Sequence, residues 1–344
     1  MAVGEGCAVL PEIDAARCVH TAIETASCRA CVDVCPSGAW RLDDAALEID
    51  TGQCDGCGLC VPACPRQAIH LPLVFARRPL AGSNAMLAAC YRAADDRHTE
   101  SVAVPCLHAI GLLDLLRAYR SGQHIWLLAY RNCADCAHGR GESLFTRAAH
   151  LNTALRQRGQ PTILLREVAM SVWSRLIKTP TTVQEQGRRE FLRALSQRPA
   201  AALLGEDIVP EQAVKKPPGE YFPDGDDALL PWVVHLDAAR CVGCHACAQV
   251  CPEGAIRFVE FPSAYYLRPR ACSGCGLCRD VCALQAVTLQ PWAAPTQTVL
   301  PLSKRRCRGC GAEFHLPVAT ASGVQVCWVC SRAKLTRRLY QVLS

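Results

Sequence analysis

The sequence predicts a multidomain protein that combines α+β and α/β architecture. Two cysteine-rich α+β domains flank a small parallel α/β domain, and a short cysteine-containing module follows them. Three observations lead to this expectation. The chain has 344 residues, enough for two or three domains. Its 25 cysteines fall into separate blocks. Between the first and third of these blocks, apolar strand-like runs alternate with helix-like periods.

The cysteine blocks and the segments rich in Pro, Gly and charge between them predict the domain boundaries. Eight cysteines lie within 18–64, four within 90–136, eight within 241–282 and four within 307–330, and Cys7 is left without an assigned role. A short linker, "RRPLAGSN" at 77–84, separates the first two blocks. The expected units are 1–76, 84–204, a linker at 205–231, 232–292 and 301–344.

The cysteine spacing indicates metal binding rather than a disulfide scaffold. Most cysteines belong to C-x-x-C units within a long chain whose start has no secretion-signal pattern. Two cysteines three positions apart rarely form a disulfide of good geometry, but they readily direct two thiolates at one metal centre. No apolar run is long enough for a membrane-spanning helix. We therefore expect a cytoplasmic metalloprotein.

Three runs repeat one pattern: "CDGCGLCVPACP" from 54, "CVGCHACAQVCP" from 241 and "CSGCGLCRDVCA" from 272. Each is followed by a short alternating strand. Residues 12–72 and 232–290 therefore resemble the dicluster [4Fe–4S] ferredoxin family, in which the fourth cysteine of each run ligates the cluster of the other run. The resemblance implies a strand–loop–helix–strand unit present four times, and four [4Fe–4S] clusters.

Carried over by position, the resemblance implies four ligand sets. They are Cys35, Cys54, Cys57 and Cys60; Cys18, Cys28, Cys31 and Cys64; Cys251, Cys272, Cys275 and Cys278; and Cys241, Cys244, Cys247 and Cys282.

The second of these sets is irregular. Nine residues, "VHTAIETAS", separate Cys18 from Cys28 where the pattern has two. We expect this insertion to loop out and leave an intact cluster, although the site could instead be empty or hold [3Fe–4S]. Ala283 replaces the usual proline after Cys282, which alters a turn but removes no ligand. The C-x-x-x-C-x-x-C order of S-adenosylmethionine radical enzymes does not occur.

The middle domain is expected to be a parallel sheet with helices at 109–122 and 142–159, each closed by a glycine. Strand-like runs end at Cys90, Cys106 and Cys133, and Cys136 lies in the loop that enters the second helix. Since the carboxyl ends of parallel strands form one ligand-binding edge, these thiols could converge on a [2Fe–2S] cluster or zinc. The alternative is a set of buried or reactive thiols.

The order of these features is similar to that of the delta subunit of methyl-viologen-reducing hydrogenases, with Asn152 in the following helix, although Cys133 and Cys136 are more closely spaced here. The resemblance implies that the domain passes electrons between a redox enzyme and an acceptor subunit. His108 and His138 lie beside the cysteines, and we expect both to be solvated. Residues 167–204, with Trp173, are expected to be helical and to serve in packing or partner contact.

The C-terminal segment contains C-x2-C-x16-C-x2-C, the spacing of a zinc ribbon formed by Cys307, Cys310, Cys327 and Cys330. Rubredoxin-type iron is the competing metal. The net charge of +6 is concentrated here: residues 301–344 carry eight Lys or Arg and one acidic residue, which leaves a net charge of −1 for the rest of the chain. Such a segment suits docking to a partner protein.

No nucleotide loop, Ser–His–Asp set or paired carboxylates stand out, so we expect a non-catalytic iron–sulfur electron-transfer subunit. Its expected partners are a molybdenum or tungsten formate dehydrogenase-like enzyme, a hydrogenase or a heterodisulfide-reductase-like flavoprotein, and not nucleic acid. One alternative is a redox-sensing assembly or regulatory protein that binds its partner through the zinc ribbon and basic tail. Another is a dithiol enzyme acting at Cys133 and Cys136.

Overall fold

The computed structural model describes residues 9–42, 47–80, 83–93, 103–131, 133, 136, 138, 142–178, 216–225 and 227–333. Cys7, the end of the basic tail, residues 205–215 and 226 of the linker, and the later part of the expected helical stretch 167–204 lie outside these residues.

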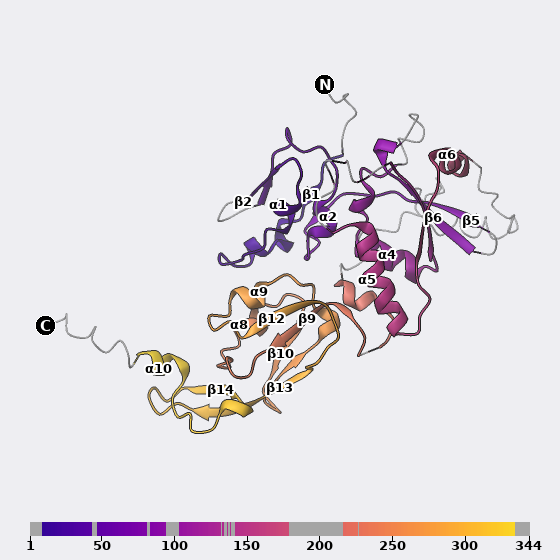
Figure 1. Cartoon of the computed structure of the whole chain (residues 1–344). Helices are drawn as coiled ribbons and strands as arrows, with labels where there is room; N and C mark the ends of the chain where they lie inside the picture. Colours follow the sequence, from indigo (N-terminus) through magenta and orange to yellow (C-terminus); the bar gives the residue numbers. More distant parts are fainter. Residues whose placement is uncertain are drawn as a thin grey trace, which may run out of the picture.

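The first cysteine-rich unit consists of two short β-ribbons and two short helices (Figure 1). Its elements are β1 Glu12–Ile13, α1 Ala30–Val34, β2 Trp40–Leu42, β3 Leu47–Ile49, α2 Cys60–Ala63 and β4 Ile69–His70. The outer strands β1 and β4 pair antiparallel, and so do the inner strands β2 and β3. This nested pairing brings the beginning and the end of the unit together.

The second cysteine-rich unit repeats the same nesting with longer strands. Its elements are β9 Leu230–Leu236, α8 Ala246–Val250, β10 Ile256–Val259, β11 Ala264–Leu267, α9 Leu277–Asp280 and β12 Val287–Ala293. Strand β9 pairs antiparallel with β12, and β10 pairs antiparallel with β11. The four short strands expected after the cysteine runs are present as β2, β4, β10 and β12.

The middle domain is a four-stranded sheet in the order β5-β6-β7-β8 with helices on both faces. Its elements are β5 Ala76–Leu80, β6 Ser83–Ala89, α4 Leu112–Arg120, β7 Ile125–Ala129, α5 Leu144–Gln157, β8 Leu164–Glu167 and α6 Met170–Lys178. Strands β6, β7 and β8 are parallel, as expected. Residues 77–80, expected within a linker, instead form most of β5, which pairs antiparallel with β6.

Alternating side chains of β6 and β7 face opposite layers of this domain. Met86 and Trp126 join the apolar core beneath α4 and α5, whereas Leu87 and Leu127 join a second core with Trp173 of α6. This alternation follows from the two-residue period of a strand. Of the expected strand ending at Cys106, only residues 103–106 are described, and they contribute a parallel bridge between Val104 and Cys90.

The C-terminal segment continues the sheet of the second unit. Strand β13 Val299–Arg306 pairs antiparallel with β11 on one side and with β14 Glu313–Pro317 on the other, and helix α10 Trp328–Ala333 follows. The buried side chains of Leu300 and Leu302 belong to the second unit's core. We expected a separate module over 301–344, but its first strand is part of the second unit.

Residues 216–225 connect the middle domain to the second unit. They include a 3-10 turn, η6 Pro218–Tyr221, and the Phe222 side chain is buried in the middle domain's core. From the second unit, Arg270 donates hydrogen bonds to the carbonyl oxygens of Phe222 and Pro223. This connecting segment therefore contacts both the middle domain and the second unit.

We expect Gly219→Ala to loosen this contact. A Cβ at Gly219 would lie 2.5 Å from the Arg270 carbonyl oxygen and 2.9 Å from its Cα, and neither backbone atom can move aside cheaply. The variant should be destabilised by about 1–3 kcal/mol, seen as a lower thermal unfolding temperature. A Cβ added at Gly52 would have its nearest neighbour at 3.4 Å, a side-chain carboxylate oxygen of Asp50. Gly52→Ala should therefore change the free energy of unfolding by less than about 0.5 kcal/mol. Equal losses in the two variants would contradict the packing argument.

Candidate metal centres

Three of the four cysteine runs use left-handed backbone to wrap their loops. The residues with positive φ are Gly56 and Gly58, Gly243 and His245, and Gly274 and Gly276. Glycine adopts this conformation without a Cβ clash, which explains the glycines between the cysteines. His245 is the exception at φ 66°. Its ring packs against Phe258 and Tyr265, and the Tyr265 hydroxyl accepts a hydrogen bond from its backbone N–H.

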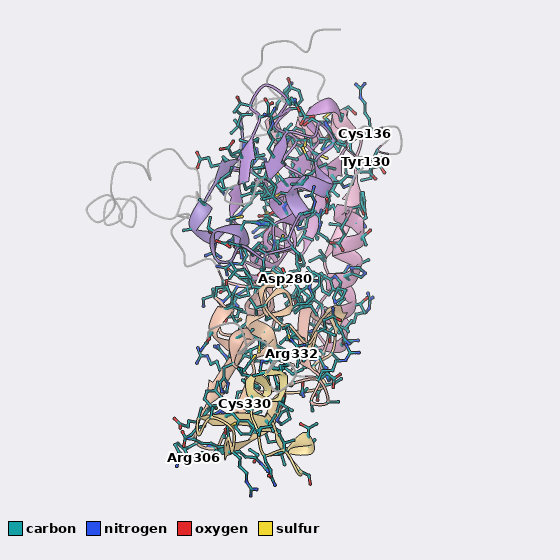
Figure 2. The ribbon with its side chains drawn as sticks, turned by 90° about the vertical axis from the view of Figure 1, so that its left-hand side faces the viewer. Tyr130, Cys136, Asp280, Arg306, Cys330 and Arg332 are labelled. Carbon is teal, nitrogen blue, oxygen red and sulfur yellow. The ribbon has the colours of Figure 1, made fainter. Side chains whose placement is uncertain are left out.

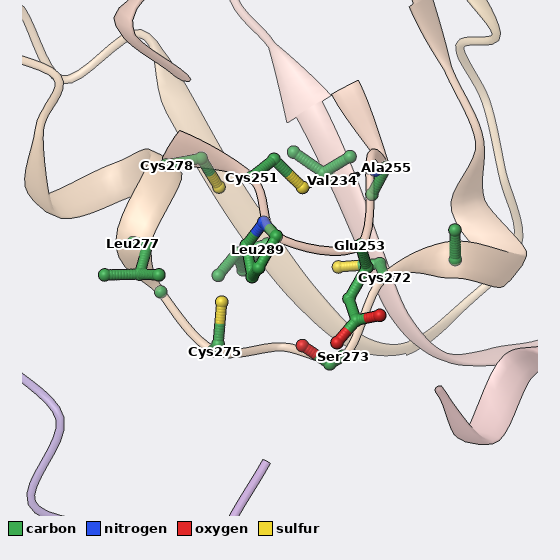
Figure 3. Close-up of a pocket in the computed structure, with 13 residues that line it drawn as sticks. Val234, Cys251, Glu253, Ala255, Cys272, Ser273, Cys275, Leu277, Cys278 and Leu289 are labelled. Carbon is green, nitrogen blue, oxygen red and sulfur yellow. Dashed lines mark hydrogen bonds between the residues drawn. The ribbon is translucent and has the colours of Figure 1, made fainter. Parts of the chain in front are cut away.

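In the second unit, Cys251, Cys272, Cys275 and Cys278 line one hollow (Figure 3). The hollow has about 330 Å³ of space not filled by atoms, part of which is open to solvent, and apolar side chains such as Leu277 and Leu289 contribute to its wall. Cys251 comes from the preceding run, so the structure brings together one complete cross-run set expected from the sequence.

The irregular set forms a comparable hollow in the first unit. Cys18, Cys28, Cys31 and Cys64 line it together with Val19 and His20 of the insertion. The insertion begins with a 3-10 turn at Val19–Thr21, and the His20 ring lies 2.7 Å from the Cys28 carbonyl oxygen through Nε2. The insertion thus folds back along the hollow and leaves the four thiols together.

The remaining two cross-run sets are also close in space. In the first unit, burial raises the pKa of Cys60 to about 12, and the charges of Cys54 and Cys35 add to the shift. Likewise, burial raises the pKa of Cys247 to about 12 in the second unit, with the charges of Cys241, Cys244 and Cys282 adding to it. Each thiol therefore lies within electrostatic reach of the cysteines expected to share its centre.

The fourth cysteine of a run accepts a hydrogen bond from the backbone amide four residues later. The amide nitrogen of Ala68 is 3.3 Å from Cys64 Sγ, that of Ala255 is 3.2 Å from Cys251 Sγ, and that of Ala286 is 3.2 Å from Cys282 Sγ. For Cys35, the hydroxyl of Ser37 and the amide of Ala39 outweigh burial and lower the thiol pKa. These donors stabilise sulfur as thiolate, the form that binds metal.

The donor set fits iron–sulfur clusters. Burial raises the pKa of Cys31 and Cys272 to about 12, so these two thiols stay protonated at neutral pH when nothing else is bound. A bound metal centre supplies the positive charge that reverses this preference and deprotonates the coordinating thiols. Soft thiolate ligands with amide donors and an apolar wall are the surroundings in which proteins hold such clusters.

The four middle-domain cysteines also converge. Cys90 directly follows β6, and its backbone is bridged to Val104, two residues before Cys106. Burial raises the pKa of Cys106 to about 11, with further contributions from the charges of Cys90, Cys136 and Cys133. The carboxyl edge of the parallel sheet therefore gathers the thiols that the sequence placed there.

Two histidines that we expected to be solvated are buried instead. His138 is 5% exposed, and its Nε2 lies 2.5 Å from Asp55 Oδ2 in the loop of the first unit's regular run. His108 is 7% exposed and accepts a hydrogen bond from the Leu144 backbone N–H through Nδ1. The sequence carries no signal for these contacts, because each joins segments distant in the chain. The contact between His138 and Asp55 links the middle-domain cysteine loop to the first unit.

The C-terminal cysteines form a compact site of a different kind. The sulfur atoms of Cys307, Cys310, Cys327 and Cys330 all lie within 4.8 Å of one another. Backbone amides, led by that of Cys327 at 3.2 Å from Cys307 Sγ, lower the pKa of Cys307 to about 6. Four thiolates around one ion, with metal–sulfur bonds of about 2.3 Å, require such closely spaced sulfurs.

This terminal site is anchored to the second unit. A Cβ at Gly243 would lie 2.2 Å from the carbonyl oxygen of His315 in β14, so only glycine permits this approach. In addition, His245 Nε2 and His315 Nδ1 are 3.0 Å apart. Strand β14 therefore packs against the loop that follows Cys241. Within the described part of the chain, no helix has the length and apolar character needed to cross a bilayer.

Comparisons with known proteins agree with the geometry of the two cysteine-rich units. Residues 26–69 and residues 240–286 each match a family described as a 4Fe-4S dicluster domain. The first match begins near the end of the insertion.

Two curated relatives match short stretches of the chain. The uncharacterized ferredoxin-like protein YdhX of Escherichia coli (strain K12) is 45% identical over 42 residues, which are 12% of this chain and 19% of that protein. A subunit of the ion-translocating oxidoreductase complex of Methanosarcina acetivorans is 46% identical over 44 residues, which are 13% of this chain and 17% of that protein. The chain thus spans less than a fifth of the length of each relative.

The matched regions, the repeated loops and the cross-run cysteine sets lead to one conclusion. The chain contains two 4Fe–4S dicluster ferredoxin domains, and these domains support a function in iron–sulfur electron transfer.

Proposed function

We propose that the protein is an electron-relay subunit that holds four [4Fe–4S] clusters, two in each cysteine-rich unit. The observation that carries this proposal is the convergence of four cross-run sets of cysteines, two of which line hollows of their own. A single sensing centre would not need this repetition. When bound, such clusters accept and release one electron at a time.

In this proposal, the chain's own residues hold and insulate the clusters. The thiolates of each set supply the ligands, and the amides of Ala68, Ala255 and Ala286 support the sulfur charge. Apolar residues such as Leu277 and Leu289 limit the contact of the hollow of the Cys272 run with water. Hydrogen bonds to sulfur and restricted solvent access are the features through which a protein adjusts cluster potentials.

We further propose that the middle-domain cysteines hold a [2Fe–2S] cluster that connects the relay to a partner. Cys106 packs in the same apolar group as Cys57 and Cys60 of the nearest ferredoxin set, and Asp55 bonds His138 across the same boundary. Among the described residues, the sulfur atoms of Cys307, Cys310, Cys327 and Cys330 all lie within 4.8 Å of one another, but those of Cys90, Cys106, Cys133 and Cys136 do not. This wider spacing favours a cluster over a single ion.

The partner is proposed to be a redox enzyme. One partial relative is a subunit of an ion-translocating oxidoreductase complex, which supports a role for this chain within a complex. A formate dehydrogenase-like enzyme, a hydrogenase or a heterodisulfide-reductase-like flavoprotein would each supply or take electrons at the middle domain. For the terminal site we propose structural zinc, because four thiolates leave no open coordination position.

The first test is metal analysis of protein purified without oxygen. Four [4Fe–4S] clusters require about 16 iron and about 16 sulfide per chain, and a [2Fe–2S] cluster adds about two of each. Reduction with dithionite should give EPR signals that interact magnetically, because the clusters lie within one small protein. A wild-type protein with fewer than about 8 iron per chain would rule out the four-cluster proposal.

Two matched cysteine variants separate the terminal site from the clusters. Cys310→Ser should lose about one zinc per chain and keep its iron, since it breaks a single-ion site. In contrast, Cys278→Ser should lose up to about four iron and keep its zinc. Zinc and iron are measured on the same samples by elemental analysis. Loss of iron and not zinc from Cys310→Ser would instead indicate a rubredoxin-type site.

Affinity capture from the native cell tests the proposed partner. We expect an oxidoreductase to co-purify and to reduce the iron–sulfur protein when given its own substrate, with the EPR signals as the readout. Recovery of a transcription complex instead would contradict the relay and support the regulatory alternative.

A further inference from the structure

The two ferredoxin units contact each other at a seam that we define by Ser27 and Arg66 of the first unit and Glu253 and Asp280 of the second. These contacts join residues between 187 and 253 positions apart in the chain. Figure 2 shows Asp280 where the ribbon of the first part of the chain meets that of the second unit. No sequence pattern or family match assigns a role to this seam.

The first contact is made by the insertion of the irregular run. The backbone N–H of Ser27 donates to Asp280 Oδ2 at 2.8 Å, and its hydroxyl donates to Asp280 Oδ1 at 2.9 Å. Arg279 donates to the Ser27 hydroxyl oxygen at 3.0 Å. The Asp280 side chain is only 7% exposed, so the acceptor of these bonds is largely covered, whereas Ser27 itself lies at the surface. The inserted residues therefore end in a specific hydrogen-bonded contact with the other unit.

The second contact is an ion pair between Arg66 and Glu253, whose side chains are 11% and 18% exposed. Arg17 approaches the same carboxylate at 3.9 Å, and its Nε donates to the Arg66 carbonyl oxygen at 2.8 Å. Charges with so little solvent around them interact more strongly than a surface pair, and removing one partner leaves the other unpaired. The pair therefore fixes how the two units meet.

Both contacts lie beside expected cluster ligands. Ser27 precedes Cys28, and Arg66 is two residues beyond Cys64 of the same set. On the other side, Glu253 is two residues beyond Cys251 and Asp280 two beyond Cys278, again of one set. The seam therefore brings together one particular site from each unit. These are the two sites whose cysteines line the hollows described above.

Electrostatics place these two sites within reach of each other. Burial raises the pKa of Cys28, and the charge of Cys275 from the other unit is one of the smaller contributions. For Cys275, burial again dominates and raises the pKa, while the charge of Arg66 acts in the opposite direction. Arg66 thus acts on a ligand of the opposite unit.

We propose that the insertion at 19–27 and the Arg66–Glu253 pair are positioning elements that align the Cys18/Cys28/Cys31/Cys64 and Cys251/Cys272/Cys275/Cys278 centres for direct electron transfer across the seam. This inference rests on the proposed function, because it requires a cluster at each centre. In the step, one electron leaves the reduced cluster of one unit and enters the oxidised cluster of the other, with no bond made or broken. The two units then form one continuous relay.

The test compares seam variants of the full-length protein by EPR after complete reduction. Interactions within each unit are present in every variant, so differences between spectra report on the seam. We expect Glu253→Arg, which faces Arg66 and Arg17 with a like charge, to lose the part of the magnetic interaction that crosses the seam. The exchanged pair Arg66→Glu with Glu253→Arg should regain it. Arg41→Gln, which breaks the exposed Arg41–Asp50 pair elsewhere in the first unit, should match the wild type.

Hydrogen exchange and iron content complete the experiment. Asp280→Asn should speed amide exchange in residues 19–27, because it weakens the acceptor of the Ser27 N–H. Iron content must equal that of the wild type, which separates failure of the seam from failure of the proposed clusters. If Glu253→Arg loses iron, Glu253→Gln provides the same comparison with the side-chain shape kept. Wild-type EPR spectra in the iron-loaded seam variants would overturn the proposal.

Discussion

The structure depends on keeping groups of thiols close together, with nearly all of the described ones partly or fully buried. Each thiolate repels its neighbours, and burial raises the pKa of Cys31, Cys60, Cys247 and Cys272 to about 12. A polypeptide gains little from such an arrangement by itself. It becomes favourable when a metal centre supplies the compensating positive charge. The left-handed glycines, the amides that donate to sulfur and the apolar walls all serve this one requirement.

The same requirement explains why the two units have nested strands. A centre that takes its last ligand from the other run can form only if the two runs face each other. Pairing of the outer strands β9 and β12, and of the inner strands β10 and β11, brings this about. The first unit achieves the same result with much shorter strands, β1 with β4 and β2 with β3. Metal ligation can therefore supply stability that such short strands do not.

Long-range polar contacts arrange the units relative to one another. Asp55 meets His138 between the first unit and the middle domain, Arg66 meets Glu253 between the two ferredoxin units, and His245 meets His315 beneath the terminal site. At each boundary the contact lies within a few residues of a cysteine. Such placement couples the geometry of neighbouring centres, so that a change in domain packing would also change the separation of the centres.

The sequence by itself placed neighbouring thiols together within each run, because C-x-x-C spacing is a local property that directs thiolates to one point. The expectation that the fourth cysteine of a run joins the other run's set came from the resemblance to ferredoxins. The sequence also determined the parallel strands and both main helices of the middle domain, since apolar periodicity is local too. It could not determine that 77–80 pairs as β5, that His108 and His138 are buried, or that β13 joins the second unit's sheet. The tertiary structure alone decided which centres are neighbours and gave the insertion at 19–27 a contact with Asp280. The physical reason is that these outcomes depend on hydrogen bonds and packing between residues far apart in the chain, for which no local pattern exists.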